Sequence, residues 1–279
     1  MIVEKQNWFL IALKYIFLVF VSIIVLFPLI WLVMTAFKTR AEIFSEPFRL
    51  IPRNFRFSNF TTAWSWAPFG AYYINTVITS LGLLLIQLFV VTMAAYSFAR
   101  IEFPGRDFLF TLFLVQLMIS VQSTIFPNYL MIANLRLVDT RLGIMLPYFA
   151  SANGTFLLRQ AFRSINQSLE DAAKLDGCNT FQLLWYVFLP QVTPTILAFS
   201  IISVTYHWNE FLWPLLVSAT TRSRTLTVGL TVFAQQAEGG AEWGLLMAAT
   251  LFVISPVLLA FTFFQKKFVQ SYASSAVKG

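Results

Sequence analysis

Residues 169–190 read LEDAAKLDGCNTFQLLWYVFLP, a charged segment with a turn that lies among long apolar runs. Ser168 or Asn166 can cap a short helix at its start, where the early carboxylates complement the positive end of a helix. Because polar backbone and charged side chains are costly in lipid, a connection of this kind lies outside the membrane. The segment therefore predicts an elbow between spans that docks on a surface outside the bilayer.

The residues of this elbow suit a contact with another protein. Ala172 and Ala173 leave a face almost free of side chains, so a partner can approach the backbone closely, and Gly177 permits the chain to reverse. Beyond the turn, apolar residues at i, i+3, i+4 and i+7 predict one apolar stripe on a helix. The members of this stripe are Phe181, Leu184, Trp185 and Phe188. The alternative is an amphipathic connector that rests on the lipid surface and contacts no partner.

Composition puts the rest of the chain in a bilayer. With 58% hydrophobic residues, 11% charged residues and a mean hydropathy of +0.73, the chain has too few polar side chains to coat a soluble protein of 279 residues. A span needs about 20 apolar residues, and arginines at its ends can snorkel to the headgroups. The uncharged stretches predict an all-α integral membrane protein with six transmembrane helices. These helices are expected near residues 15–37, 71–99, 108–127, 141–163, 191–217 and 243–266.

The predicted organisation has three parts. Residues 1–70 hold the first transmembrane helix and an outer loop, residues 71–266 form the main transmembrane domain, and residues 267–279 form a cytoplasmic tail. The first apolar stretch could instead be a cleaved signal sequence, because basic residues precede it. Its apolar run is longer than the usual signal-peptide core and has no obvious cleavage site, so we interpret it as retained.

The few cysteine and histidine residues, and the lack of a phosphate loop, argue against a disulfide-bonded protein, a metalloprotein and an ATPase. One cysteine, Cys178, and one histidine, His207, rule out an internal disulfide and argue against a metal cluster. His207 is expected to pack against a neighbouring helix. The chain has no G-x4-G-K-[ST] phosphate loop and no paired intramembrane carboxylates, so we expect it not to be an enzyme. Its net charge of +7 could suggest nucleic acid, but the basic residues are scattered through loops, and membrane edges explain them better.

Residues 171–190 follow the spacing D-A-A-x3-G-x9-V-x-L-P. This spacing resembles the EAA loop of binding-protein-dependent ABC importer permeases, written E-A-A-x3-G-x9-I-x-L-P. Asp171 replaces Glu and keeps its charge, and Val187 replaces Ile. The resemblance implies a type I ABC importer permease fold in which this segment is a cytoplasmic coupling helix. The residues implied to couple the chain to an ATPase are Glu170, Asp171, Ala172, Ala173, Asp176 and Gly177.

Other short motifs resemble the carbohydrate subfamily of these permeases, typified by the maltose-permease G subunit. They lie at residues 73–77, 94–106, 208–214, 265–268 and 276–279. Ser271 departs from the glycine expected near the end of the chain. The resemblance implies inward transport of a di- or oligosaccharide, or of a related polyol or glycerol-phosphate ester. A permease for a non-sugar nutrient with the same elbow is the alternative.

The same resemblance implies partners and a location. A second, similar permease subunit, two ATP-binding subunits and an extracytoplasmic sugar-binding protein would complete the importer. ATP and Mg²⁺ would be bound by the partner ATPase, and no cofactor by this chain. The protein would be a multi-pass protein of the inner, or cytoplasmic, membrane with both termini in the cytoplasm, moving its substrate by alternating access.

A sugar offers hydroxyls and an apolar ring face, so its path needs hydrogen-bonding side chains beside aromatic rings. The candidates for such a path are Asn75, Tyr206, Trp208, Asn209, Glu210 and Trp213. The tryptophans could instead form an interfacial belt, Glu210 could be hydrated near the outer boundary, and Asn75 could bond one helix to another. Residues 220–242 are too polar for lipid and are expected outside, either reaching into the binding protein or forming a linker.

Overall fold

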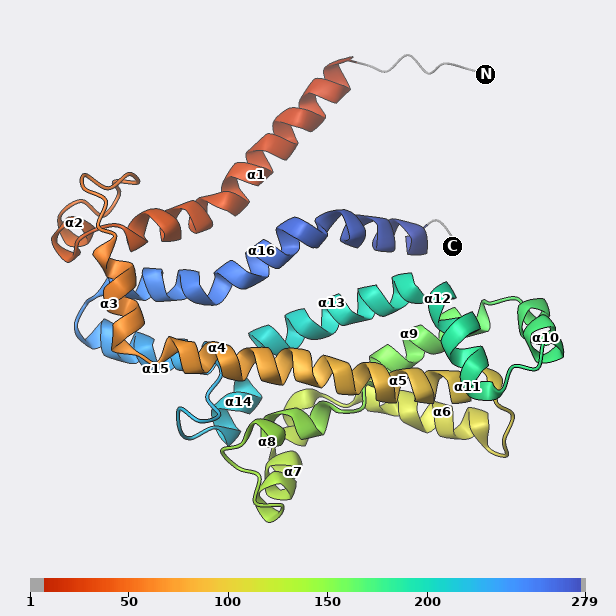
Figure 1. Cartoon of the computed structure of the whole chain (residues 1–279). Helices are drawn as coiled ribbons and strands as arrows, with labels where there is room; N and C mark the ends of the chain where they lie inside the picture. Colours follow the sequence, from red (N-terminus) through yellow and green to blue (C-terminus); the bar gives the residue numbers. More distant parts are fainter. Residues whose placement is uncertain (1–7, 277–279) are drawn as a thin grey trace. The chain divides into compact units, whose positions relative to one another are not determined.

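The computed structural model describes residues 8–276, and over that range the chain folds into helices without a strand (Figure 1). The chain divides into two compact units. Unit 1 comprises Met1–Pro68 and Leu230–Pro256, and unit 2 comprises Phe69–Gly229 and Val257–Gly279. Each unit therefore contains two separate stretches of sequence.

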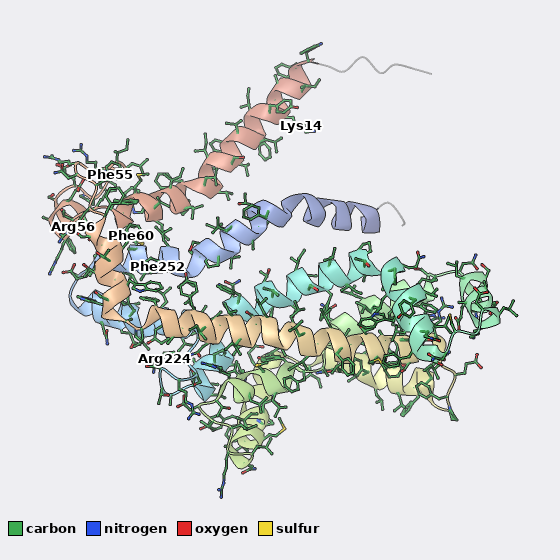
Figure 2. All side chains as sticks on the ribbon, in the orientation of Figure 1. Lys14, Phe55, Arg56, Phe60, Arg224 and Phe252 are labelled. Carbon is green, nitrogen blue, oxygen red and sulfur yellow. The ribbon has the colours of Figure 1, made fainter. Side chains whose placement is uncertain are left out.

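Unit 1 holds the first helices of the chain and parts of the last two. Its helices are α1 (Trp8–Ala36), α2 (Arg40–Ser45) and α3 (Ser58–Trp66), with most of α15 (Leu226–Gly239) and the first part of α16 (Trp243–Ala276). An aromatic cluster packs inside it: the Phe37 and Phe60 rings lie 5.0 Å apart, and the Trp64 and Phe252 rings 5.2 Å apart. Phe60 and Phe252, labelled in Figure 2, connect the two pairs at 6.1 Å. Because these rings come from both ends of the sequence, they bind unit 1 together.

Unit 2 begins with one long helical rod and continues through shorter elements. The rod consists of α4 (Phe69–Val77), a π-helical turn η1 (Ile78–Gly82) and α5 (Leu83–Arg100). After it come α6 (Arg106–Val115), η2 (Gln116–Met118), α7 (Val121–Asn134), α8 (Arg141–Met145), η3 (Leu146–Tyr148) and α9 (Ala152–Arg163). The unit then contains α10 (Gln167–Leu175), α11 (Thr180–Gln182), η4 (Leu183–Phe188), α12 (Leu189–Gln191), α13 (Thr193–Asn209) and α14 (Leu212–Val217).

The main core of unit 2 lies where α5, α9, η4 and α13 meet. It is built from buried apolar residues that include Val91, Leu158, Phe162, Phe188 and Phe199. At Gly154 a side-chain carbon would come within 2.5 Å of the Phe199 ring, so only glycine lets α9 pack this closely on α13. Small residues at helix contacts are typical of membrane proteins, where close packing replaces hydrophobic burial as the source of helix association.

Three helices are long and apolar enough to cross a membrane. They cover Ile11–Ala36, Phe69–Arg100 and Trp243–Phe263, and the sequence predicts a helix at each of these places. Two further pairs meet the same criteria only when taken together, because each is bent: Arg106–Met118 with Val121–Asn134 by 103°, and Thr180–Gln191 with Thr193–Asn209 by 78°. The described residues thus contain three candidate spans, or up to five if each bent pair is one span.

The prediction of a continuous helix over residues 191–217 is wrong, and Pro214 explains the break. A helix through residue 210 would need the amide hydrogen of residue 214 to bond the Glu210 carbonyl, and proline has none. Glu210 is extended instead, with ψ of 127°, so Pro214 falls in the first turn of α14, where it is tolerated. The carbonyl that is left over accepts a hydrogen bond from Thr227 Oγ1 at 2.9 Å.

The helices predicted over residues 108–127 and 141–163 are also interrupted. The first bends at Ile119 and Ser120, which have extended ψ values of 124° and 133°. The second breaks after a turn that contains Pro147, and Ser151 then caps α9 by accepting a hydrogen bond from the Gly154 amide at 3.1 Å. Pro147 could have indicated the second break, whereas no glycine or proline marks the first.

The polar segment predicted at residues 220–242 contains a helix, α15, over most of its length. The start of this helix is fixed within unit 2, because the Leu226 amide donates to Thr76 Oγ1 at 2.8 Å. Gly229 lies so close to the Tyr72 ring that a side-chain carbon there would come within 2.3 Å of it. A linker without structure, one of the two alternatives, is therefore excluded for residues 226–239.

Candidate coupling site and transport path

The elbow of the sequence forms α10, and both of its ends are defined by local bonds. Asn166 has an extended backbone, and its side chain accepts a hydrogen bond from the Ser168 amide at 3.1 Å, so Asn166 is the cap. At the other end Gly177 has φ of +84°, a value that glycine adopts without strain. The Cys178 amide then donates to the Ala173 carbonyl at 3.0 Å, which closes the helix as a Schellman turn.

One face of α10 is anchored to the core of unit 2 through Glu170. This carboxylate is buried and lies 3.3 Å from Arg100, at the end of α5, and 2.9 Å from Lys174. The hydrogen bond from Lys174 to Glu170 holds the pKa of the lysine above its ordinary value. Arg100 also donates to the carbonyls of Phe162 at 2.7 Å and Ile165 at 2.5 Å. We call Arg100, Glu170 and Lys174 the anchor network.

The opposite face and the tip of α10 are exposed. Asp171, Ala172, Asp176 and Gly177 are all open to the surroundings, and Leu175 at the tip exposes 90% of its surface. Ala173, in contrast, is buried in the core. The six residues predicted to couple the chain to an ATPase therefore fall into two groups, since Glu170 and Ala173 hold the helix in place and only the other four are free to meet a partner.

The apolar stripe predicted after the elbow is wrong in its membership. Leu184 and Phe188 are buried, but Phe181 and Trp185 each expose 60% of their surface, and Leu183 is buried in their place. The cause is that residues 183–188 form a π-helical stretch, which has more residues in each turn than an α-helix. A pattern counted at 3.6 residues per turn therefore assigns the wrong residues to the buried face.

A second arginine, Arg159, connects α9 to α5 and α6, a role that was not predicted from the sequence. Arg159 Nε donates to the Phe98 carbonyl at 3.1 Å, and its guanidinium lies 3.6 Å from Asp107 and 3.8 Å from the centre of the Phe110 ring. Its position between Leu158 and Gln160 gives no sign of partners 49 to 61 residues earlier in the chain. Arg100 was missed for the same reason, because its carboxylate partner lies 70 residues away.

Asn75, a candidate for the sugar path, lies in a polar network at the other end of the rod. Its side-chain nitrogen donates to the carbonyls of Thr221 at 3.0 Å and Arg224 at 2.8 Å, and its oxygen accepts from Arg141 Nε at 2.8 Å. Arg224, labelled in Figure 2, lies in the connection before α15. Asn75 is buried, and its hydrogen-bonding groups are used within the chain.

Asp139 completes this second network, and no pattern in the sequence indicates it. The carboxylate accepts hydrogen bonds from the amides of Ala219 and Thr220, each at 2.9 Å, and from the hydroxyls of Thr220 at 2.6 Å and Ser223 at 2.5 Å. Burial by itself would raise the pKa of Asp139, but these hydrogen bonds lower it well below its ordinary value. We call the set of Asn75, Asp139 and Arg141, with the residues of 219–224 that they bond, the loop network.

The other path candidates lie at the end of α13 and the start of α14. Tyr206 and Asn209 are exposed, and Glu210 is half-buried and accepts a bond from the Trp213 amide at 3.3 Å. Trp208 and Trp213 are buried, and the Trp213 ring nitrogen donates to the Ile144 carbonyl at 3.1 Å. Of these five residues, which are neighbours in the sequence, Trp208 and Trp213 are buried. Only Tyr206, Asn209 and Glu210 have exposed surface that a substrate could contact.

Gln87, near the middle of the rod, forms a polar cluster with Tyr148 and Ser203 that was not predicted from the sequence. Gln87 donates to the Tyr148 carbonyl at 2.7 Å and accepts from Ser203 Oγ at 2.6 Å. The His207 ring lies 4.9 Å from the Tyr148 ring, which confirms that His207 packs against a neighbouring helical element. Within residues 8–276, no three histidine, cysteine, aspartate or glutamate side chains are grouped closely enough to hold a metal ion.

Two thirds of the chain match one family model. Residues 89–274 match the family described as the binding-protein-dependent transport system inner membrane component. The chain belongs to this family. The match begins within α5 and runs through α10 into α16, so it includes both the anchor network and the loop network apart from Asn75. Members of this family are membrane components of transport systems, which accords with the long apolar helices described above.

Two bacterial permease proteins resemble the chain along almost all of its length. The probable ABC transporter permease protein YurM of Bacillus subtilis (strain 168) is 33% identical over 278 residues, which cover 99% of this chain and 91% of YurM. The diacetylchitobiose uptake system permease protein NgcG of Streptomyces coelicolor is 33% identical over 269 residues, with 96% of this chain and 89% of NgcG covered.

The fold is shared with a solved structure. A chain from the crystal structure of a bacterial ABC transporter involved in the import of the acidic polysaccharide alginate superposes with a TM-score of 0.84. The alignment covers 95% of this chain and 99% of the other, at 21% sequence identity. This likeness establishes the permease fold for the present chain.

Proposed function

We propose that this chain is a transmembrane permease subunit of an ATP-driven importer that moves a carbohydrate inward by alternating access. The observation that carries the proposal is the construction of α10. Its Glu170 face is fixed to the end of α5 and to α9 through Arg100, while Asp171, Asp176 and Gly177 project freely. A helix held firmly on one side and exposed on the other can pass a push from a partner to the helices that anchor it.

The motor in this proposal is a separate protein. Two ATP-binding subunits, which carry ATP and Mg²⁺, grip the exposed tip of α10 on the cytoplasmic side. Closure of that pair tilts α10, and the anchor network transmits the tilt to α5 and α9 because Arg100, at the end of α5, bonds both Glu170 on α10 and the Phe162 carbonyl on α9. ATP hydrolysis then resets the bundle.

The membrane arrangement is part of the same proposal. Six spans with both termini in the cytoplasm follow if the two bent pairs are single spans and α8, η3 and α9 form the sixth. Residues 1–70 then hold the first span and an outer loop, residues 71–266 the main domain, and residues 267–279 the tail. A second, similar permease subunit completes the path, and an extracytoplasmic binding protein delivers the substrate.

A carbohydrate is supported by relatives and by side-chain chemistry. The chain resembles a diacetylchitobiose permease and, at 29% identity, the sn-glycerol-3-phosphate permease UgpE of Yersinia pestis, and its fold matches that of an alginate importer. Tyr206, Asn209 and Glu210 present a ring and polar groups on one exposed stretch of chain. Such a combination suits a sugar, which has an apolar face and hydroxyls.

The test is uptake by proteoliposomes that contain the assembled importer with ATP inside and the cognate binding protein outside. Labelled diacetylchitobiose, alginate oligosaccharide and sn-glycerol 3-phosphate are compared with leucine as a non-sugar nutrient. ATP-dependent uptake of one of the first three supports the proposal. Uptake of leucine alone contradicts the carbohydrate class, and uptake by this chain without its ATPase indicates a channel and contradicts the coupling role.

A further inference from the structure

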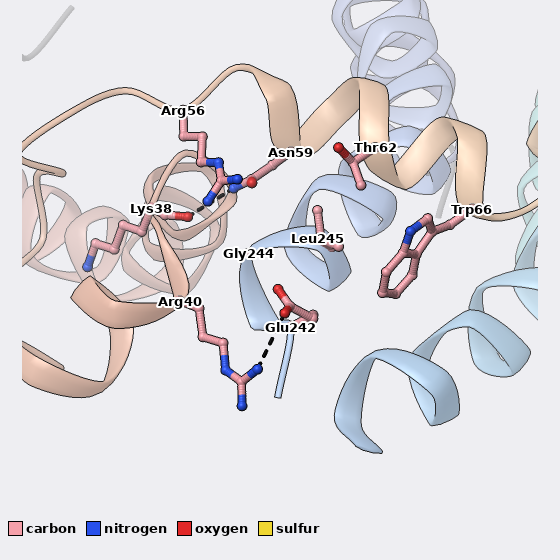
Figure 3. A pocket seen from close by; sticks show the side chains of 9 residues that line it. All are labelled: Lys38, Arg40, Arg56, Asn59, Thr62, Trp66, Glu242, Gly244 and Leu245. Atoms are coloured by element: carbon pink, nitrogen blue, oxygen red, sulfur yellow. Dashed lines mark hydrogen bonds and ion pairs between the residues drawn. The ribbon is translucent and has the colours of Figure 1, made fainter. Parts of the chain in front are cut away.

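A pocket in unit 1 lies where two of the apolar helices end. It has a volume of about 210 Å³ and is lined by residues that follow α1, by α3 and by the start of α16 (Figure 3). Lys38 comes two residues after the end of α1, and Gly244 is the second residue of α16. Both helices are long and apolar enough to cross a membrane, so in the proposed membrane arrangement, on which this inference rests, the pocket would lie at the edge of the hydrocarbon layer.

The pocket is mainly cationic. Arg40 and Arg56 line it with one carboxylate, Glu242, which lies 3.5 Å from Arg40, and Lys38 lines it with its ammonium bonded to the Arg49 carbonyl. Arg56 bonds Ser58 Oγ at 3.1 Å and, among residues 8–276, makes no ion pair. The positive end of α16 adds to this field. An anion that entered would therefore meet Arg56, which has no carboxylate partner in the described part of the chain, and Arg40, whose ion pair with Glu242 is long and exposed.

The wall of the pocket is held in place by buried groups. Asn59, on α3, donates to the carbonyls of Ala36 at 2.8 Å and Lys38 at 2.9 Å. Lys38 is buried, its ammonium bonds the Arg49 carbonyl, and it lies 5.1 Å from the centre of the Trp31 ring. Buried Asn59 and Lys38 therefore fix the backbone of the wall, and the side chains of Arg40 and Arg56 are exposed at its mouth.

Large apolar side chains of the segment that contains Arg40 and Arg56 are exposed. They are Phe44, Phe48, Ile51, Phe55 and Phe57, each exposing at least half of its surface. They alternate along residues 40–58 with arginines, of which Arg56 is labelled beside Phe55 in Figure 2. Aromatic and basic residues mixed in this way are typical of segments that lie in the headgroup layer of a bilayer.

We propose that this pocket binds the headgroup of an anionic phospholipid, with the phosphate between Arg40 and Arg56 and the acyl chains beside the apolar ends of α1 and α16. Arginine binds a phosphate through paired hydrogen bonds, and the pocket volume accommodates a phosphodiester. The exposed aromatic residues favour a ligand with acyl chains over a water-soluble anion. The bound lipid would fix the outer segment of residues 38–58 against the membrane and is separate from substrate transport.

The experiment is native mass spectrometry of the assembled importer titrated with dioleoylphosphatidylglycerol, dioleoylphosphatidylcholine or inorganic phosphate. The native complex is expected to retain phosphatidylglycerol in preference to phosphatidylcholine and to retain no inorganic phosphate. Arg40→Gln and Arg56→Gln should each weaken phosphatidylglycerol binding about fivefold, the effect of one basic residue at an anionic membrane surface. Arg40→Lys and Arg56→Lys should keep most of the binding.

The matched control is Arg53→Gln, which removes an exposed arginine of the same segment that pairs with Glu46 outside the pocket. It should leave lipid binding unchanged, and assembly of every variant is checked by its elution as one complex. Equal retention of both lipids, or unchanged phosphatidylglycerol binding in both glutamine variants, overturns the proposal. Equally tight binding of inorganic phosphate overturns it in favour of a soluble anion. Weaker affinity for the binding protein with unchanged lipid retention overturns it in favour of a protein partner.

Discussion

The two ends of the rod formed by α4, η1 and α5 carry polar networks that are used in different ways. Asn75 and Arg100 lie 25 residues apart on this rod, or roughly 38 Å at the rise of an α-helix. In the anchor network, Arg100 and Glu170 fix one face of α10 and leave its tip exposed. In the loop network, Asn75 and Asp139 direct their side-chain bonds to neighbouring loops of the same unit.

The buried polar groups of both networks hold the fold together, whereas the exposed tip of α10 is available for contact with a partner. A buried polar group whose bonds are satisfied within the chain holds elements together, and its removal costs stability. An exposed group beside such a frame costs little to remove but is free to meet a partner. Substitutions in the anchor network and the loop network should therefore reduce stability, whereas substitutions at the α10 tip should reduce coupling.

The largest effect is expected from Arg100→Met, which leaves Glu170 buried without its arginine. Removing one partner of a buried ion pair costs about 3–5 kcal/mol, and the low end of this range is expected here because Lys174 still pairs with Glu170. Thermal unfolding of the purified importer measures this change. The control is Arg163→Met, at an exposed position at the end of α9, which should have little effect. Equal stability of the native chain and the Arg100→Met variant would contradict the anchor network.

A smaller effect, on coupling and not on assembly, is expected from Gly177→Asp. Space beside Gly177 is open, but its φ of +84° disfavours a side chain by about 1–2 kcal/mol, and the new charge lies at the exposed tip. ATP-driven uptake should fall by about tenfold or more, a change of at least 1.4 kcal/mol in coupling, while ATP hydrolysis continues.

Gly105→Asp is the matched control for this prediction. Gly105 has φ of +79° and equally open space, but it lies in the turn between α5 and α6. Normal uptake in the Gly177→Asp variant would contradict a docking role for the tip of α10. An equal loss in both variants would mean that strained turns reduce transport wherever they are.

Asp139→Asn tests the loop network and should destabilise it by about 1 kcal/mol, the low end for a charged acceptor because the carboxylate is half-exposed. The pKa of Asp139 is lower in the folded chain than its ordinary value of 3.8. Its stabilising effect is therefore present above pH 3.8 and is lost as the pH falls through the folded pKa. Hydrogen exchange of residues 218–225, measured from pH 7 down to about pH 2, follows the start of this loss below the unfolded pKa.

The D139N variant should show faster exchange in those residues at pH 7, and its difference from the native chain should shrink at the acid end. Asp176→Asn is the control, since Asp176 is exposed at the tip of α10 and distant in sequence from these loops. Protection of residues 218–225 that is the same in D139N as in the native chain would show that the Asp139 bonds do not hold the loops.

The smallest effect is expected from Glu210→Gln. The glutamine oxygen can still accept the hydrogen bond from the Trp213 amide, and the Glu210 carbonyl keeps its bond from Thr227. Uptake should change by less than about twofold, which corresponds to under roughly 0.5 kcal/mol. A complete block of uptake in a normally assembled importer would instead identify Glu210 as a main contact of the substrate.

Some features of the coupling site could be predicted from the sequence, and others could not. Asn166 as a possible cap, Gly177 as a turn and the charges of α10 could be predicted, because capping and backbone reversal depend on residues a few positions apart. The partners of Glu170 could not, since Arg100 is distant in the sequence and nothing local indicates the pairing. The π-helical stretch at residues 183–188 also misled a pattern that assumes 3.6 residues per turn.

The sequence by itself determined that this chain is a helical membrane protein with a polar elbow, because apolar length and the spacing of residues 171–190 are local properties. The tertiary structure decided which face of α10 is anchored, where the apolar helices break and which path candidates are buried. Those outcomes depend on groups such as the Arg100 side chain, the Thr227 hydroxyl and the Ile144 carbonyl. They meet Glu170, Glu210 and Trp213, respectively, only after the chain has folded. Long-range pairings of this kind are set by packing and by the need to satisfy buried polar groups.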